Sequence, residues 1–214
     1  NTGIGYQSLE ANTTGTQNTA VGTFALDANT TTSHNTAVGY AALGANTDGA
    51  NLTAVGRSAL SANTTANWCT AVGYNALASN TTGNYNTAFG HKSLEDNTSG
   101  ADNAAFGNYA LMDNNGSNNT GIGNYALDAN TTGGSNTAVG RSALSGNTTG
   151  AENTAVGYAA LISNTTGNYN TAMGVNALED NTASHCTAIG YKALCENTTG
   201  DANTAVGLRA LDLN

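Results

Sequence analysis

Apolar and polar residues follow one pattern that repeats at a seventeen-residue period along the whole sequence. The repeat reads N-T-A-V-G-Y-x-A-L-x-x-N-T-T-G-x-x, and its positions are numbered here from 1 to 17, starting at its first Asn. A fixed period of this kind predicts a repeat architecture in which each copy packs only on its neighbours. The glycine at position 5 recurs once per repeat, as Gly5, Gly22, Gly39, Gly56, Gly73, Gly90, Gly107, Gly123, Gly140, Gly157, Gly174, Gly190 and Gly207.

The length and content of the repeat predict a β-solenoid. Helical repeats need about 33 residues for two packed helices, and Gly, Asn and Thr recur too often for stable helix. We therefore expect an all-β protein, a β-solenoid (β-roll) of thirteen 17-residue coils that forms a single repetitive domain over residues 1–214, with the last copy truncated. Each coil should hold two short strands, TAVG and roughly xALxx, separated by turns at the glycine and at NTTG.

Four columns of the repeat contain only apolar or very small residues. Position 9 is always Leu and position 4 is Val, Ile, Phe or Met, while position 8 is Ala or Ser and position 3 is Ala or Gly. Because adjacent strand residues point to opposite faces, the pairs 3/4 and 8/9 predict two packed surfaces. One is the coil interior, and the other is a contact with a second copy of the chain. So thin an interior contributes little against the entropy of ordering each coil, so we expect lateral self-association.

Two columns are dominated by asparagine. Position 12 is Asn in every copy, from Asn12 to Asn214. These amides either form a ladder between coils or suit the turn before TTG, and both interpretations stay open. Position 1 is Asn in ten copies and Leu52, Cys69 or Cys186 in the others, which indicates that this column is at least partly buried.

Two coils are one residue shorter than the others. Positions 1 to 12 stay in phase on both sides of each, so the alignment places the missing residue after Asn118 and after His185, at position 17. A turn can lose a residue where a strand would flip its faces. We therefore expect the backbone to differ only in the second turn.

Composition and charge narrow the function classes. Ala, Thr, Asn and Gly supply 131 of the 214 residues, and Leu, Ile, Val and Phe only 31, although just 9% of residues are charged and none is proline. This is typical neither of a globular enzyme nor of a disordered linker. A net charge of −9 with five scattered Lys and Arg predicts no nucleic-acid partner. The absence of an apolar run of about 18 residues predicts no membrane insertion.

Residues with catalytic or metal-binding chemistry are scattered. His34, His91 and His185, at positions 17, 6 and 16, never share a coil, so no zinc or catalytic pair is expected. Acidic residues at positions 10 and 11 are candidates for calcium binding or acid–base work, but a solvated edge is favoured because Ala, Ser and Gly share their columns. They are Glu10, Asp27, Glu95, Asp128, Glu179, Asp212, Asp96, Asp113, Asp180 and Glu196.

The cysteines form no disulfide framework. Cys69 and Cys186 share a column but lie seven coils apart, beyond disulfide reach. Cys186 and Cys195 fall in one coil, and their pairing is left open. The sequence contains no catalytic triad order, P-loop or dinucleotide fingerprint. We predict that the chain is not an enzyme and has no catalytic, cofactor-binding or metal-binding residues.

Aromatic residues recur at two positions. Tyr6, Tyr40, Tyr74, Tyr158 and Tyr191 stand at position 6, and position 17 holds Trp68, Tyr85 and Tyr169. Such columns serve either as platforms for sugars or as stacks between coils, and stacking that stabilises the solenoid is favoured.

The repeat, here NTAVGYAALISNTTG at 153–167, resembles the repeats of phage tail-fibre and bacterial surface-fibre proteins. In those families it often precedes an intramolecular chaperone that trimerises the chain. More distantly it resembles the head repeats of trimeric autotransporter adhesins. The resemblance implies a fragment of a longer fibre, assembled as a parallel homotrimer. It also implies an extracellular, cell-surface or virion location, with a cell-surface glycan or protein as candidate receptor.

The function expected from these features is structural. We predict a shaft or adhesive segment of an extracellular or virion fibre, which spaces or presents a receptor-binding tip. The alternative is an ice- or carbohydrate-binding β-solenoid that acts through Thr or Tyr columns. Thr fills position 2 in twelve of thirteen copies and is frequent at 13 and 14. Position 2 shares a strand face with the apolar position 4 and is expected to point inward, which counts against the ice-binding alternative.

Overall fold

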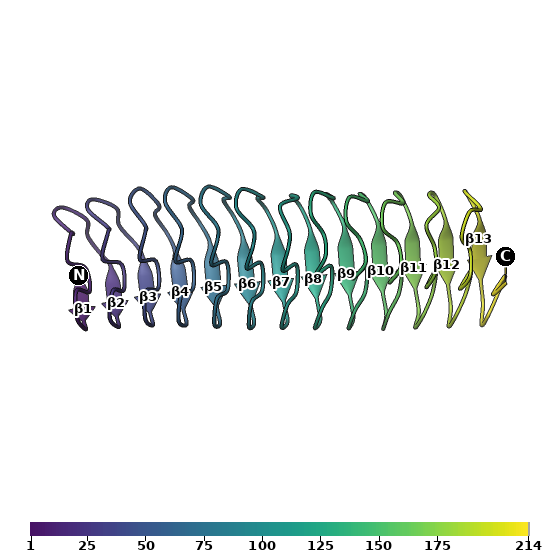
Figure 1. Cartoon of the computed structure of the whole chain (residues 1–214), viewed down its shortest axis with the longest axis horizontal. Helices are drawn as coiled ribbons and strands as arrows, with labels where there is room; N and C mark the ends of the chain where they lie inside the picture. The colour runs from purple at the N-terminus through teal and green to yellow at the C-terminus, as the bar shows by residue number, and fades with distance from the viewer. Residues whose placement is uncertain (214) are drawn as a thin grey trace. The chain divides into compact units, whose positions relative to one another are not determined.

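The computed structural model of the chain describes residues 1–213, so the last asparagine of the position-12 column, Asn214, lies outside the described residues. Residues 1–105 form one compact unit, and residues from Phe106 onward form another. Both consist of coils that each contribute one three-residue strand, at positions 2 to 4 (Figure 1). The strands are β1 (Thr2–Ile4), β2 (Thr19–Val21), β3 (Thr36–Val38), β4 (Thr53–Val55), β5 (Thr70–Val72), β6 (Thr87–Phe89), β7 (Ala104–Phe106), β8 (Thr120–Ile122), β9 (Thr137–Val139), β10 (Thr154–Val156), β11 (Thr171–Met173), β12 (Thr187–Ile189) and β13 (Thr204–Val206).

The strands confirm the predicted solenoid. β1 to β6 in the first unit and β8 to β13 in the second pair in parallel with their neighbours in chain order, each residue opposite its equivalent in the next coil. Thr36, for example, lies opposite Thr53. β-Branched Thr and Val suit these pleated positions, and residues 1–213 contain no helix. The single-domain organisation stays a prediction.

The prediction of a second strand at positions 7 to 11 is wrong, because each coil within residues 1–213 forms a strand at positions 2 to 4 only. Positions 7 and 9 have left-handed backbone conformations, with φ of 56° at Ser58 and 50° at Leu60. The backbone still bonds to both neighbouring coils, because Ser58 N donates to the carbonyl of Tyr40 (2.9 Å) and Leu60 N to that of Ala76 (3.0 Å). Left-handed non-glycine residues cost roughly 1–2 kcal/mol each. These hydrogen bonds and the burial of the leucine offset that cost.

Positions 3, 8 and 9 fill the interior of the coils between the two ends of the solenoid. In the coil of residues 52–68, Ala54, Ala59 and Leu60 are fully buried, whereas Val55 is 36% exposed. The expectation that positions 3 and 4 face opposite ways is therefore confirmed. For positions 8 and 9 it is wrong, because the left-handed residues at positions 7 and 9 turn two successive side chains inward.

The invariant glycine at position 5 is required on two counts. Gly56 has φ of +139°, a conformation that only glycine adopts cheaply. A Cβ there would also lie 2.3 Å from the carbonyl oxygen of Gly73 in the next coil. We call positions 5 to 9 the glycine turn.

The second turn, positions 12 to 17, is named here the asparagine turn. The Asn63 amide donates to Asn46 Oδ1 (2.8 Å) and to the carbonyl of Ala66 in its own turn (3.2 Å). Both interpretations of the position-12 column thus hold, since one amide links coils and closes the turn. At position 1, Asn35 Oδ1 accepts from the backbone N–H of Leu52 (3.0 Å). This column is buried, as its apolar replacements predicted.

Each short coil has one residue where the other coils have two, at positions 13 and 14. The prediction that the missing residue is at position 17 is therefore wrong. In residues 170–185, the Asn181 amide donates to the carbonyl of Ala183, two residues on (2.9 Å), where Asn164 donates to Gly167, three residues on (3.0 Å). Ala183 therefore occupies position 15 and His185 position 17. In residues 103–118, the Asn114 amide likewise donates two residues on, to Gly116 (2.9 Å).

Position 17 is kept because its left-handed residue bonds to the preceding coil. His185 has φ of 61°, and its N–H donates to the carbonyl of Asn168 (3.0 Å). The expectation that the change stays within the second turn is confirmed. Thr171 still pairs with Thr187, and Leu111 N still donates to Ala126 (2.9 Å).

Candidate functional surface

The outer side of the strands carries two parallel columns, which we call the sheet face: position 2, mostly Thr, and position 4, always apolar. The expectation that both columns point inward is wrong. Period-2 alternation turns positions 2 and 4 outward once the small residue at position 3 occupies the interior. The Thr hydroxyls at position 2 make no hydrogen bond to any residue within 1–213.

Large apolar side chains on the sheet face are exposed to solvent. Phe89 is 39% exposed, Ile122 41% and Met173 45%. Neither column contains a charged residue in any of the thirteen copies, although the chain carries a net charge of −9. An ordered, uncharged and partly apolar surface is typical of a contact site.

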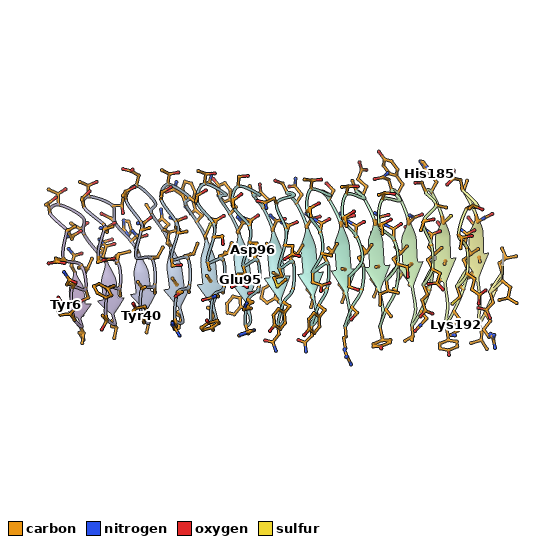
Figure 2. The ribbon with its side chains drawn as sticks, viewed as in Figure 1. Tyr6, Tyr40, Glu95, Asp96, His185 and Lys192 are labelled. Atoms are coloured by element: carbon orange, nitrogen blue, oxygen red, sulfur yellow. The ribbon has the colours of Figure 1, made fainter. Side chains whose placement is uncertain are left out.

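Position 6 forms an aromatic and cationic edge beside the sheet face, and Figure 2 shows Tyr6 and Tyr40 along it. The Arg57 guanidinium carbon lies 5.8 Å from the ring centre of Tyr40 and 5.7 Å from that of Tyr74. On the far side of Tyr74 the His91 ring is stacked at 5.3 Å. Position 6 thus holds a run of contacting side chains from four successive coils, from Tyr40 to His91. Their shared place in the repeat could have revealed it from the sequence.

Position 17 confirms the predicted stacking between coils. The rings of Trp68 and Tyr85 are parallel with centroids 5.1 Å apart, and Tyr169 and His185 stack at 5.0 Å. Because these rings turn faces toward one another, those faces are closed to a sugar. His185 thereby contacts an aromatic ring, and His34, exposed at the same position, lies in another coil.

The Thr side chains at position 13 contribute to the structure. Thr64 Oγ1 donates to the carbonyl of Thr81 (3.2 Å), and Thr148 Oγ1 to that of Thr165 (3.0 Å). These hydroxyls are therefore already engaged between coils and cannot form a free hydroxyl array.

The acidic residues at positions 10 and 11 differ in exposure, and Asp113 is partly buried. Asp96, Asp180 and Glu196 at position 11 are exposed, as a solvated edge requires. The prediction of a solvated edge is wrong for Asp27 and Asp128 at position 10, because their Oδ1 atoms are buried without a hydrogen-bond partner. Burial, with a smaller contribution from the charge of Asp113, raises the pKa of Asp128 to about 6. Burial likewise raises the pKa of Asp27, with a smaller contribution from Glu10.

Other position-10 carboxylates have partners. Glu95 forms an ion pair with Lys92 (3.1 Å) and accepts from the Asn75 amide (2.7 Å). Glu179 Oε2 accepts from the Cys195 thiol (3.3 Å). Glu10 is exposed, and Asp212 pairs with Arg209 (2.6 Å).

The three cysteines are free and buried, so Cys186 and Cys195 do not pair. The Cys69 thiol lies 3.3 Å from the carbonyl of Gly83, where an asparagine amide would donate. Burial raises the pKa of Cys69 to about 11, which keeps it an unreactive thiol at neutral pH.

Residues 1–213 enclose no pocket and bring together no cluster of three metal-ligating side chains. Within the same residues no helix has the length and apolar character needed to cross a membrane. No known protein family matches this chain, and neither a curated protein nor a solved structure does. The sheet face and the position-6 edge are therefore the two surfaces on which function can be argued.

Proposed function

We propose that the chain is a structural shaft or adhesive segment of a homo-oligomeric fibre outside the cell or on a virion. The observation that carries the proposal is the sheet face, an uncharged apolar column on the outer side of the strands beside an interior that is already filled. The predicted absence of catalytic and cofactor sites agrees with this role and stays a prediction.

A second copy of the chain is the partner that fits the sheet face best. Side chains at position 4 recur once per coil, at the strand spacing of about 4.8 Å. Only a partner with the same spacing can contact each of them in the same way, and a sister chain has it by construction. Both columns are uncharged, so two chains with net charge −9 can meet there without placing like charges in contact.

The number of chains comes from the resemblance to fibre repeats, which favours a parallel homotrimer. Closed symmetry of this kind would protect the sheet faces from open-ended aggregation. The same resemblance supports a location on a cell surface or virion, with a glycan or protein receptor.

Mass in solution tests the proposal. Light scattering on the chain with its natural flanking segments should give a multiple of the monomer mass. Val38→Lys with Val55→Lys places charges on the sheet face at partly exposed sites and should yield monomers that keep their β-structure. Thr65→Lys with Thr82→Lys, at exposed position 14, is the matched control and should stay assembled. A stable monomer of the unmodified protein would contradict the fibre.

A second candidate function is ice binding by the same face. It is favoured by one observation, the outward Thr hydroxyls without protein partners, which alternate with apolar groups about 6.6 Å apart along each strand. Large side chains such as Phe89 and Met173 interrupt the flat array, so the fibre stays the first proposal. Thermal hysteresis by a monomeric chain, abolished by Thr53→Tyr, would support ice binding instead.

A further inference from the structure

The position-6 edge of the first unit holds a cation, Arg57, that has no counter-ion among residues 1–213. Arg57 lies between the rings of Tyr40 and Tyr74, at 5.8 and 5.7 Å from their centres. These rings are 49% and 40% exposed, so the guanidinium sits at the surface between two accessible phenols. Cation–π contacts on both sides restrain the guanidinium.

No acceptor within residues 1–213 bonds the Arg57 guanidinium. The segments that bear the three side chains, residues 36–43, 53–60 and 70–77, contain no Asp or Glu. Glu95, which reaches this edge through the Asn75 amide, is already paired with Lys92. The N–H donors of Arg57 are thus available to a ligand.

We propose that Tyr40, Arg57 and Tyr74 form a binding site for a saccharide that bears a carboxylate. The planar guanidinium binds a carboxylate through two parallel hydrogen bonds. The two phenol hydroxyls beside it can donate to or accept from sugar hydroxyls. Because the guanidinium is already held by two rings, less side-chain entropy is lost when the ligand binds.

The same geometry argues against neutral sugars at this place. A neutral pyranose stacks on an open aromatic face, but the facing sides of Tyr40 and Tyr74 are covered by Arg57. The other face of Tyr74 is covered by His91. Charge pairing with the guanidinium is therefore the main interaction that these three side chains offer a ligand, and the phenol hydroxyls add hydrogen bonds.

The chain supplies two arginines for comparison. Arg141, also at position 6, lies over one ring only, that of Tyr158 at 5.9 Å, and its other position-6 neighbour is Asn124. Arg209 is ion-paired with Asp212 at 2.6 Å. Affinity for the acidic saccharide should fall in the order Arg57, Arg141, Arg209. This site lies beside the sheet face, and it does not depend on the fibre proposal.

Titration of the full chain with trigalacturonic acid tests the site, with the neutral galactose trisaccharide and inorganic sulfate as comparison probes. Calorimetry should show binding of the acid only, and Arg57 Nε–H should shift first in NMR spectra. Arg57→Gln should weaken binding about tenfold or more, the usual effect of losing a charged hydrogen-bond donor. Arg57→Lys should recover part of the affinity, and Arg209→Gln should change nothing.

Circular dichroism of Arg57→Gln should match the unmodified chain, because the side chain is exposed. Equal binding of the neutral trisaccharide, equal binding of sulfate, or unchanged affinity in Arg57→Gln would each overturn the proposal. Absence of binding by the unmodified chain would overturn it as well. None of these outcomes bears on self-association, which light scattering measures separately.

Discussion

Two adjacent coils of the second unit, residues 153–169 and 170–185, differ by a single residue in length. In the longer coil the Asn164 amide bonds to the preceding coil, because it donates to Asn147 Oδ1 at 3.2 Å. In the shorter coil the Asn181 amide turns to Ala183, and Asn164 Oδ1 is left buried without a partner. The backbone N–H groups of Thr148 and Thr149 donate to the carbonyl of Thr165 in the next coil. Within residues 1–213, the equivalent bonds from the longer coil to the shorter coil are missing.

The strand and the glycine turn are unchanged across the same step. Met173 pairs with Ile189, and Gly190 N donates to Met173 at 2.8 Å. The comparison shows that the asparagine turn can lose a residue, and that the loss removes one amide–amide hydrogen bond between coils. The glycine turn holds the register of the coil and is expected to tolerate no change.

Deleting one residue from each turn of the coil at 136–152 tests this contrast most strongly. Removal of Ser142 from the glycine turn would shift the following Leu144 out of the interior and should cost more than about 4 kcal/mol of unfolding free energy. Removal of Thr149 from the asparagine turn should cost about 1–2 kcal/mol, since it recreates a natural short coil. Urea unfolding followed by circular dichroism gives both values.

Hydrogen exchange resolved by peptide locates the damage. Loss of protection should spread over neighbouring coils for the Ser142 deletion and stay within the asparagine turn for the Thr149 deletion. Equal costs for the two deletions would show that the turns do not differ as the short coils indicate.

Substitution of a single glycine sharpens the contrast without changing the length. Gly56→Ala puts a Cβ 2.3 Å from the carbonyl of Gly73 at a φ of +139°. This clash and the strained backbone together should cost about 3 kcal/mol. Gly44→Ala is the matched control, because its Cβ would lie 3.4 Å from its nearest neighbours, at ordinary contact distance. Urea midpoints read from the fluorescence of Trp68 should fall for the first variant only.

The sequence predicted the solenoid, the period and the thin interior because each depends on columns that repeat. It failed where the backbone conformation breaks the usual rules for L-residues. Leu at position 9 was predicted to lie in a strand, but its backbone conformation is left-handed, as the φ of 50° at Leu60 shows. That error placed positions 8 and 9 on opposite faces. The inward direction predicted for position 2 has another source, the assignment of the apolar position 4 to the interior. The position-6 site was missed because the aromatic column was defined by its tyrosines alone. Arg57, which stands between Tyr40 and Tyr74 in that column, counted only as one of five scattered cations.

Removing one amide at position 12 should reveal how much a ladder link contributes. Asn147 donates to Asn130 at 2.7 Å and accepts from Asn164 at 3.2 Å. Asn147→Ala loses both links and should cost about 3 kcal/mol. In the short coil, Asn181 has one ladder link, from Asn197 at 2.8 Å. Asn181→Ala should therefore cost about 2 kcal/mol. Equal losses in urea unfolding would mean that the turn bond, and not the ladder, dominates.

Restoring the missing residue should repair the ladder. A Thr inserted after Thr182 gives the coil at 170–185 its seventeenth residue and lets the Asn181 amide reach Asn164 Oδ1. Satisfying this buried acceptor should stabilise the second unit by about 1 kcal/mol. The same insertion after Thr148, in a full-length coil, is the control and should not stabilise. An unaltered Asn164 amide resonance in NMR spectra would contradict the repair.

An effect of similar size is expected at position 10, which lies outside the altered turn. Asp128 follows the short coil at 103–118 and Asp27 a full-length coil, yet burial raises the pKa of both. For Asp128 the pKa rises from 3.8 to about 6, so the folded state binds the proton more tightly than the unfolded state. Its stability contribution is complete below about pH 4, falls between about pH 4 and 6, and is lost above. Because the carboxyl is partly exposed to solvent, which screens its charge, the loss of unfolding free energy should be about 1 kcal/mol.

Asp128→Asn and Asp27→Asn should both flatten the pH dependence of stability and stabilise the protein at neutral pH. Glu152→Gln, at an exposed carboxylate, is the control and should do neither. A stabilisation confined to Asp128→Asn would show that the missing residue affects more than the asparagine turn.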